Sequence, residues 1–416
     1  MKQDTKLCLM PKRRFPEFQG AQRWTPVSLH KASTPVIERV GERRLTPVSI
    51  SAGRGFVPQA EKFGRDISGN QYQLYTLVND GDFVYNKGNS LRFPQGCVYL
   101  LNGWGQVAAP NVFICFRLKS GYSNGFFQNC FEANFHGKQL QKHITSGARS
   151  NGLLNISKEN FFSVEIPTPG PEEQQKVADC LSSMDDLIAA QARKVDALKT
   201  HKIGLMQQLF PREGETIPRL RFSEFREAGG WGKNTLGNLV EIRSGNSPSQ
   251  YKLLEDGKYP FVKVEDLNNC GKYQAEAREY SNEPDGLVPP NSVIFPKRGA
   301  AIALNKLRLA NCDMLMDTNM MALTPSEAYH VDFLFQYLSQ IGLDRIADNS
   351  TIPQINNKHI IPFPVLVPRS DEQQRISDCL TSFDNLITAS AQELETLRTH
   401  KKGLMQQLLP SAEAAI

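Results

Sequence analysis

Several polar side chains in this 416-residue chain are of the types that bind nucleic acid. Lysine and arginine neutralise phosphates, while asparagine, glutamine and threonine hydrogen-bond to base edges. Many of them follow short apolar runs, where a strand would end in a loop. The candidates for contact with double-stranded DNA are Tyr85, Lys87, Asn89, Arg92, Arg149, Asn151, Lys263, Lys297, Arg298, Thr351 and Gln354. For any single residue the alternative is a solvated surface side chain, so the prediction rests on the patch.

Two of these stretches correspond between the halves of the chain. Residues 81–87 resemble residues 291–297, since each is a strand-like run that ends in a lysine. Residues 146–155 resemble residues 349–356, since each is a polar loop close to the end of its half. Polar loops of this kind offer bidentate contacts to base edges.

Motifs for catalysis are missing from the sequence. It contains no GxxxxGK[ST] phosphate loop, no HExxH, no GxSxG and no Cys/His spacing typical of a metal site. The seven histidines are dispersed, and the eight cysteines include no CxxC pair. We therefore predict a chain without catalytic residues, bound metal or disulfides, in a reducing, cytoplasmic setting.

Composition describes an ordinary globular protein with a basic surplus outside its repeats. The mean hydropathy is −0.40 and the formal net charge is +5. Residues 172–210 carry a net charge of −1 and residues 371–409 a net charge of −2, which leaves about +8 on the rest. No apolar run approaches the roughly 18 residues of a membrane span, and we expect no secretory signal. The surplus suits a polyanionic partner.

The chain contains two repeated segments. Residues 171–211 align without a gap to residues 370–410, at an offset of 199 and with roughly 23 identical positions of 41. A shorter pair precedes each half: PKRRFPEF at residues 11–18 with Trp24, and PRLRFSEF at residues 218–225 with Trp231. We call residues 11–24 and 218–231 the leading segments. The sequences between the repeats are almost unrelated, which predicts a constant frame that holds two different recognition modules.

Each long repeat has the heptad pattern of a coiled-coil helix. Apolar residues alternate at spacings of four and three, with matched polar interruptions at Gln191 and Lys202 and at Ser390 and Lys401. Both segments begin with acidic residues and end at a proline, as helices do. We predict that the two helices pair antiparallel over roughly 60 Å. The alternative is two amphipathic helices that lie on separate cores.

Four apolar residues flank the predicted seam and would not be needed to bury a two-stranded coil. They are predicted to bind a partner protein, and they are Leu187, Met206, Leu386 and Met405.

The two inserts are predicted to be mixed α/β domains with strongly bent sheets. Strand-like runs lie at residues 73–78, 82–85, 97–101 and 111–116 of the first insert, and at residues 260–264, 291–295 and 320–323 of the second. A helical patch follows at residues 331–338. The two ends of each insert must lie close together, because the helix leaves where the leading segment enters.

This ordered combination resembles the specificity subunit of a type I restriction–modification system, from residue 11 to residue 410. The resemblance implies target-recognition domains at residues 1–168 and 212–368, and conserved spacer helices at residues 169–211 and 369–416. The expected fold class is α/β, with two mixed α/β domains, two helices paired as an antiparallel coiled coil, and a pseudo-twofold internal repeat.

The resemblance also implies a function. Each domain would read one half of a split DNA target, which should be asymmetric because the inserts are unrelated. The helices would space the domains and dock two DNA methyltransferase (modification) subunits, and restriction/translocase subunits would join the assembly. S-adenosylmethionine and ATP would belong to those partners, with no cofactor in this chain. The alternatives are a non-catalytic coiled-coil scaffold that binds proteins instead of DNA, and a solitary methyltransferase or nuclease.

Overall fold

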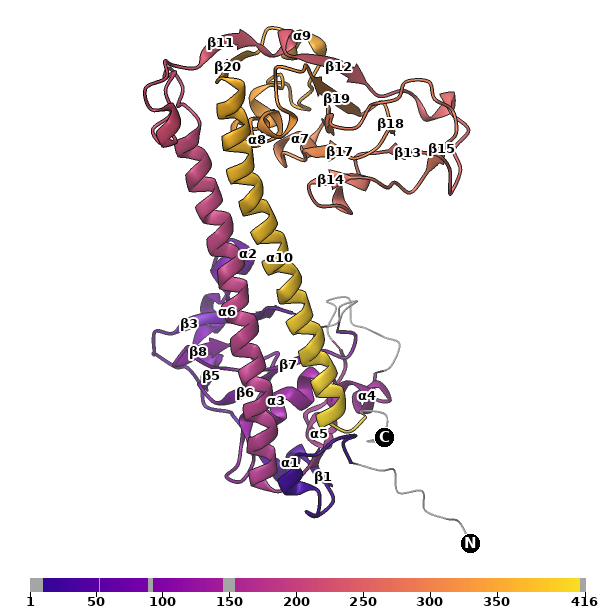
Figure 1. Cartoon of the computed structure of the whole chain (residues 1–416). Coiled ribbons are helices and arrows are strands. Elements are labelled where there is room, and N and C mark those ends of the chain that lie inside the picture. The colour runs from indigo at the N-terminus through magenta and orange to yellow at the C-terminus, as the bar shows by residue number, and fades with distance from the viewer. Residues whose placement is uncertain (1–9, 52, 89–92, 145–153, 412–416) are drawn as a thin grey trace. The chain divides into compact units, whose positions relative to one another are not determined.

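The computed structural model describes residues 10–51, 53–88, 93–144 and 154–411. The chain forms two compact units, of which unit 1 comprises residues 1–192 and 393–416 and unit 2 comprises residues 193–392. Each unit contains one insert together with parts of the two long helices, α6 (Pro171–Leu209) and α10 (Ser370–Leu408) (Figure 1). Both helices have the extent that the repeats predict.

Unit 1 contains two four-stranded sheets instead of one bent sheet. The first has the order β2-β9-β6-β7 and is antiparallel throughout, with strands Ser33–Pro35, Ile114–Leu118, Asp82–Asn86 and Cys97–Leu100. The second has the order β4-β3-β8-β5, in which only β3 and β8 are parallel, with strands Gly55–Pro58, Thr46–Ser51, Gln106–Ala109 and Thr76–Asn79.

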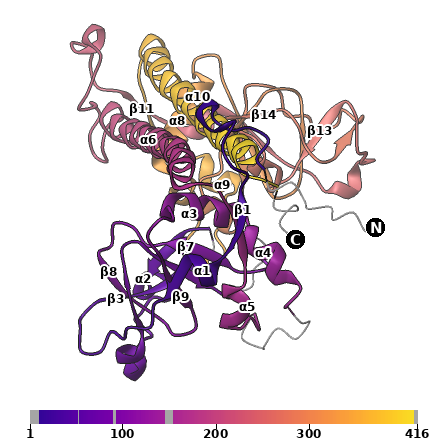
Figure 2. The same cartoon turned by 90° about the horizontal axis from the view of Figure 1, so that it is seen from below.

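The first sheet of unit 1 is covered on both faces. One face packs against the second sheet through residues such as Val84 and Val107. The other face packs against α3 (Asn124–Glu132), and the same core continues into α6 through residues such as Val177 and Leu181. Figure 2 shows α3 between α6 and the sheet that contains β7. The remaining helices of the insert are α1 (Leu29–Ala32), α2 (Gln59–Phe63), α4 (Phe135–Gln141) and α5 (Lys158–Phe162).

Unit 2 has a five-stranded and a three-stranded sheet. The larger has the order β12-β19-β16-β17-β14, with strands Val240–Ser244, Met320–Pro325, Val293–Pro296, Arg308–Ala310 and Tyr273–Gln274. The smaller has the order β15-β13-β18, with strands Tyr280–Ser281, Tyr259–Val262 and Leu315–Met316. The main core joins the larger sheet to α8 (Val331–Ile341), to the end of α6 and to the start of α10. Short helices α7 (Ala300–Ala303) and α9 (Asn357–Ile360) complete the insert.

The two ends of each insert lie close together, as the sequence predicts, and the structure shows that they pair as strands. In unit 1, β1 (Thr25–Ser28) pairs antiparallel with β10 (Glu165–Thr168). In unit 2, β11 (Gly232–Thr235) pairs antiparallel with β20 (Pro364–Val367), and Figure 1 shows them side by side. Each insert is therefore closed by a two-stranded sheet next to the start of a long helix.

The leading segments bind the first turn of a long helix. Arg14 donates from Nε to Oε1 of Glu173 at 2.8 Å, and Arg221 makes the same bond to Glu372 at 2.8 Å. The glutamine that follows this glutamate also holds the insert in each unit. The Gln174 side chain accepts a hydrogen bond from the backbone N–H of Ser123, and the Gln373 side chain accepts one from the backbone N–H of His330. The repeated arginine and the repeated Glu-Gln pair thus form one structural joint in each unit.

Parts of α6 and α10 contact each other within each unit. In unit 1, Lys401 Nζ lies 2.8 Å from Asp185 Oδ1, and Gln191 Nε2 donates to Glu393 Oε2 at 2.7 Å. In unit 2, Lys202 Nζ donates to Asp384 Oδ1 at 2.6 Å. Three of the polar interruptions in the predicted seam therefore make contacts from one helix to the other.

Candidate nucleic-acid interface

Four of the predicted DNA contacts come together in unit 2, where the end of β16 meets the loop before α9. The backbone N–H of Ile355 donates to Lys297 O, and that of Gly299 donates to Pro353 O, both at 2.9 Å. Arg298 and Gln354 form a β-bridge, and Arg298 Nη2 donates to Gln354 Oε1 at 3.4 Å. Lys297, Arg298, Gln354 and the exposed Thr351 therefore belong to one surface. We call residues 297–299 and 348–356 the unit 2 loop pair.

The unit 2 loop pair is suited to an anion. Arg298 is exposed and Lys297 is half-buried. Partial burial lowers the pKa of Lys297, and the adjacent positive charge of Arg298 lowers it further. The charge of Asp317 partly opposes this shift, and a phosphate near the two basic side chains would oppose it further, because it would add negative charge.

A carboxylate clamps the second loop of this pair. Asp348 Oδ1 accepts from the backbone N–H of Gln354 at 3.0 Å and from the hydroxyl of Ser350 at 2.7 Å. These bonds lower the pKa of Asp348, with the Ser350 hydroxyl as the first cause. The Ser350 hydroxyl also lies 2.6 Å from the backbone carbonyl of Ile352, so its single proton has two possible acceptors. Hydrogen bonds through Asp348 thus close the loop, and Ile352 is 60% exposed on it.

Unit 1 shares one of these backbone hydrogen bonds in its described residues. The N–H of Leu154 donates to Lys87 O at 2.9 Å, just as that of Ile355 donates to Lys297 O in unit 2. Lys87 follows β6 and is half-buried. The correspondence predicted from the sequence is therefore confirmed at these positions. Four further candidates lie outside the described residues, and they are Asn89, Arg92, Arg149 and Asn151.

Lys263 does not belong to the unit 2 loop pair. It follows β13, which lies in the smaller sheet of unit 2. Its ammonium forms an ion pair with Glu279 and lies 5.7 Å from the ring centroid of Phe261. The side chain is therefore engaged within its own domain.

The prediction that Tyr85 contacts DNA is wrong. Its side chain is fully buried, its hydroxyl donates to Gln95 O at 2.8 Å, and its ring stacks on Phe161 with centroids 4.5 Å apart. Burial raises the pKa of the Tyr85 phenol. The cause is that β6 is an inner strand of a sheet covered on both faces, so its side chains point into cores on either side.

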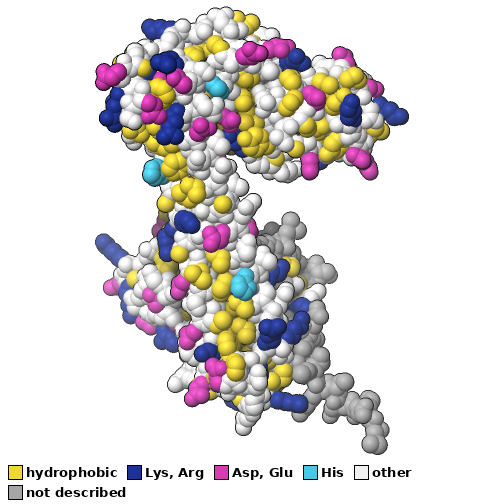
Figure 3. Space-filling view, in the orientation of Figure 1, with side chains coloured by type: hydrophobic (Ala, Val, Ile, Leu, Met, Phe, Trp, Pro, Cys, Tyr) yellow, Lys and Arg dark blue, Asp and Glu magenta, His cyan; other side chains and the backbone are white. Residues whose placement is uncertain are grey.

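Two of the four predicted partner contacts are exposed and two are not. Leu187 and Leu386, which are repeat equivalents, are each 53% exposed. Figure 3 shows apolar side chains at the surface of the long helices among charged ones. Met206 and Met405 are buried, in the main core of unit 2 and of unit 1 respectively, so their assignment to a partner surface is wrong. Each insert itself covers the methionine.

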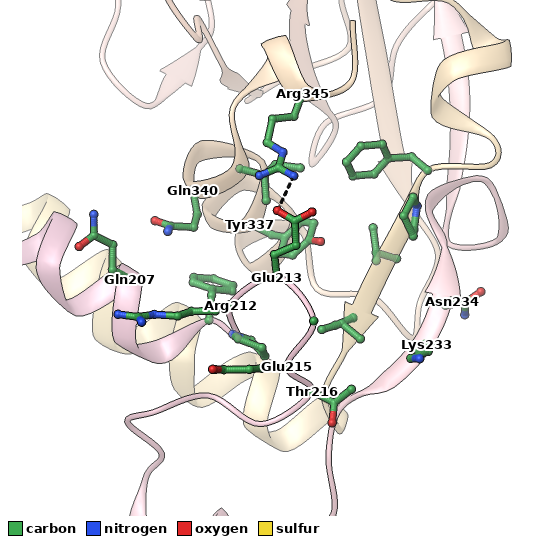
Figure 4. A pocket seen from close by; sticks show the side chains of 18 residues that line it. Gln207, Arg212, Glu213, Glu215, Thr216, Lys233, Asn234, Tyr337, Gln340 and Arg345 are labelled. Atoms are coloured by element: carbon green, nitrogen blue, oxygen red, sulfur yellow. Dashed lines mark hydrogen bonds and ion pairs between the residues drawn. The ribbon is translucent and has the colours of Figure 1, made fainter.

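A cleft of about 750 Å³ lies in unit 2 beside the end of α6. Figure 4 shows Glu213 directed at Arg345, and their Oε2 and Nη2 atoms are 3.0 Å apart. Gln207 and Arg212 line the helix side of the cleft, and Tyr337 lies behind Glu213. The lining is therefore mixed, with apolar walls and charged side chains at the rim.

Unit 1 has a cleft at the equivalent end of α10. It is lined by Gln406, Leu409 and Pro410, which are the repeat equivalents of Gln207, Phe210 and Pro211 in the unit 2 cleft. Both units thus present a depression where a long helix ends, and this feature was not predicted from the sequence.

Across the described ranges, no group of three or more His, Cys, Asp or Glu side chains could hold a metal ion. In the same ranges, no helix has the length and apolarity needed to cross a bilayer.

Comparison with known proteins gives a consistent match. A family model described as the type I restriction modification DNA specificity domain matches residues 67–200 and 228–399. The type I restriction enzyme MjaVIII specificity subunit of Methanocaldococcus jannaschii is 25% identical over 292 residues, which are 65% of this chain and 67% of that relative. The alignment thus spans about two thirds of the relative's length.

Two solved structures share the fold. One concerns complex assembly and conformational transition of the type I R-M system, with a TM-score of 0.59, 18% identity, and coverage of 93% of this chain and 98% of that one. The other is the S subunit of a type I restriction–modification system from M. genitalium, with a TM-score of 0.55, 17% identity, and coverage of 96% and 99%.

Proposed function

Because this chain belongs to the family of type I restriction–modification DNA specificity domains, we propose that it reads a split, asymmetric DNA target for a modification and restriction complex. Each unit reads one half-site. The chain itself performs no catalysis, and S-adenosylmethionine and ATP act on partner subunits.

The observation that carries this proposal is that both units join a strand end to a polar loop through the same backbone hydrogen bond, whereas the side chains of the two loops differ. In both units a lysine at a strand end accepts, through its carbonyl, an N–H from a polar loop. The basic strand end can follow phosphates, which position a protein on the duplex, while the loop reaches base edges, which carry the sequence. Because the side chains of the two loops differ, the two half-sites differ.

Selection from a pool of random duplexes by the full chain tests this proposal. We expect a split motif with two unlike halves, and affinity that falls steeply with rising salt. The full chain with residues 25–168 exchanged for another insert should change one half of the motif only. Failure to select any motif, or a change in both halves, would contradict the proposal.

Individual phosphate contacts can be tested by salt dependence. Replacing Lys297 or Arg298 with alanine should lower the slope of log affinity against log salt by about 1 each. Lys263→Ala is the matched control, because Lys263 is already paired with Glu279 and lies outside the unit 2 loop pair. An equal change of slope in all three variants would argue against a localised phosphate contact.

We further propose that α6 and α10 pair as an antiparallel coiled coil with pseudo-twofold symmetry. The contacts within the units support this: Asp185 meets Lys401 in unit 1, and Asp384 meets Lys202 in unit 2. These are repeat-equivalent pairs with the roles of the helices reversed. A polar residue at a seam position fixes the register of a coiled coil. The pair would set the distance between the half-sites.

The methyltransferase subunits are proposed to dock on the long helices. Leu187 and Leu386 support two equivalent docking surfaces, because they occupy the same repeat position and are equally exposed. The clefts at the two helix ends are a second repeat-equivalent feature that a pair of identical partners could use. Restriction subunits would then join the resulting assembly.

A further inference from the structure

Ile352 stands alone as an exposed apolar side chain on the unit 2 loop pair. It is 60% exposed, and its neighbours Ser350, Thr351 and Gln354 are polar. A single exposed isoleucine is ordinary on a protein surface, and docking sites for proteins are contiguous apolar patches. What distinguishes Ile352 is the rigidity of the loop that presents it and the basic strand end beside that loop.

The backbone at Ile352 is held from several sides. Its carbonyl lies 2.6 Å from the Ser350 hydroxyl, whose proton it shares with Asp348 Oδ1, and Pro353 restricts Ile352 to an extended conformation. The loop is closed on both sides of it, because the Asp348 N–H donates to Gln354 O at 3.0 Å and Asp348 Oδ1 accepts from the Gln354 N–H at 3.0 Å. Since isoleucine is β-branched, its side chain is also stiff. Little ordering would be needed on binding.

The chemistry of DNA offers one apolar group of matching kind in the major groove, the C5-methyl of thymine. We propose that Ile352 contacts a thymine methyl in the half-site read by unit 2, and that Asp348 is the positioning residue that holds it there. Lys297 and Arg298, on the adjacent strand end, bind phosphates of the same half-site. This inference rests on the proposed function, since it requires unit 2 to read DNA.

Thymine-to-uracil exchange tests the contact, because it removes the methyl group and leaves base pairing intact. The probes are duplexes of the motif selected by the full chain, with one thymine at a time replaced by uracil. For wild type we expect one position in the unit 2 half-site at which uracil weakens binding about fourfold. This corresponds to roughly 0.8 kcal/mol for the loss of one buried apolar carbon, converted at 1.36 kcal/mol for each tenfold change in the dissociation constant. Thymines in the other half-site serve as internal controls.

The Ile352→Ala variant should bind the thymine duplex more weakly than wild type and should no longer distinguish thymine from uracil at that position. Ile352→Val, which keeps the branched carbon, should retain part of the discrimination. Thermal unfolding of both variants should match that of wild type, because the side chain is exposed. Loss of affinity in Ile352→Ala with thymine discrimination intact would overturn the contact and indicate an apolar wedge instead.

Asp348→Ala should also abolish the discrimination, because the loop loses its clamp, whereas Asp348→Asn keeps an acceptor oxygen and should restore part of it. Asp344→Ala is the matched control, since it removes the same charge from an exposed position four residues away. Equal loss in Asp348→Ala and Asp344→Ala would overturn the positioning role.

Two failures are distinguishable. If the full chain selects no motif, the proposed function fails and the inference fails with it. If a motif is selected but its unit 2 half-site contains no thymine, or if uracil has no effect anywhere in that half-site, only the role of Ile352 is overturned.

Discussion

Arg221 and Glu372 form a buried, bidentate ion pair between the leading segment of unit 2 and the first turn of α10. Nε donates to Oε1 at 2.8 Å and Nη2 to Oε2 at 2.7 Å, and both side chains are almost fully buried. Trp231 Nε1 lies 3.2 Å from Oε1 of the same carboxylate and donates to it. Bidentate arginine–carboxylate pairs fix orientation as well as distance, so this joint sets how the domain meets its helix.

Removing one partner of this pair should be strongly destabilising. Glu372→Ala leaves the Arg221 guanidinium buried without its counter-charge, which costs about 3–5 kcal/mol. Urea denaturation of the full chain should show the loss in the transition of unit 2. Glu224→Ala is the control, because its ion pair with Arg375 is half exposed and its removal should matter far less. If Glu372→Ala and Glu224→Ala lower the free energy of unfolding equally, the buried ion pair stabilises the protein no more than an exposed one.

Acid should destabilise unit 1 through His136. Burial lowers the pKa of His136 from 6.5 to about 4, and a backbone interaction with Gly96 partly opposes that shift. The folded protein therefore prefers the neutral imidazole. The stability that folding gains from this preference is fully present above pH 6.5 and is lost as the pH falls towards about 4. The loss reaches about 3 kcal/mol at most. Denaturation curves of wild type and His136→Phe between pH 8 and pH 4 should diverge in this window, whereas His400→Gln should follow wild type.

The exposed leucines of the long helices should matter for partners and not for folding. Leu187→Asp combined with Leu386→Asp should weaken copurification with the methyltransferase subunit, while the free energy of unfolding changes by less than about 0.5 kcal/mol, as is usual for surface positions. Met206→Asp and Met405→Asp should instead unfold the chain, because both methionines are buried in the cores of the units. Undiminished partner binding by the double leucine variant would place the docking surface elsewhere.

Lengthening both helices should lengthen the unread spacer of the target. One heptad inserted after Ala192 and another after Gln392 keep the seam period and add about 10 Å. At 3.4 Å per base pair this corresponds to about three base pairs. The motif selected from random duplexes should keep both half-sites and gain that spacing. A spacer of unchanged length would show that something other than the helix pair sets it.

Local pattern was sufficient for the two long helices and for part of the strands. The heptad repeats predicted α6 and α10, and the runs at residues 82–85 and 291–295 became β6 and β16, whereas the helices α3, α4 and α5 of unit 1 were not predicted. The loop pairing at Lys87 and Lys297 also followed from the correspondence between the inserts. These features depend on residues close in sequence, or on a segment that occurs twice, so that its two copies can be aligned with each other.

Burial by distant segments could not be predicted in the same way. Tyr85 follows an apolar run and precedes a polar loop, which is also the pattern of a surface strand end. Only the packing of α5 on β6 places it in a core. Met206 and Met405 lie beside the seam, and only the inserts folded over them decide that they are internal. Ile352 gave no signal in the sequence, because its exposure depends on a clamp that joins Asp348 to Gln354.

The pairing of β1 with β10 and of β11 with β20 has a consequence for how new specificities arise. Each insert begins and ends at one two-stranded sheet beside a helix start, so an insert that keeps this strand pairing and the apolar contacts with the long helices can be exchanged as a unit. A different target would then arise through a single exchange of coding DNA, while exposed helix positions such as Leu187 and Leu386 stay unchanged.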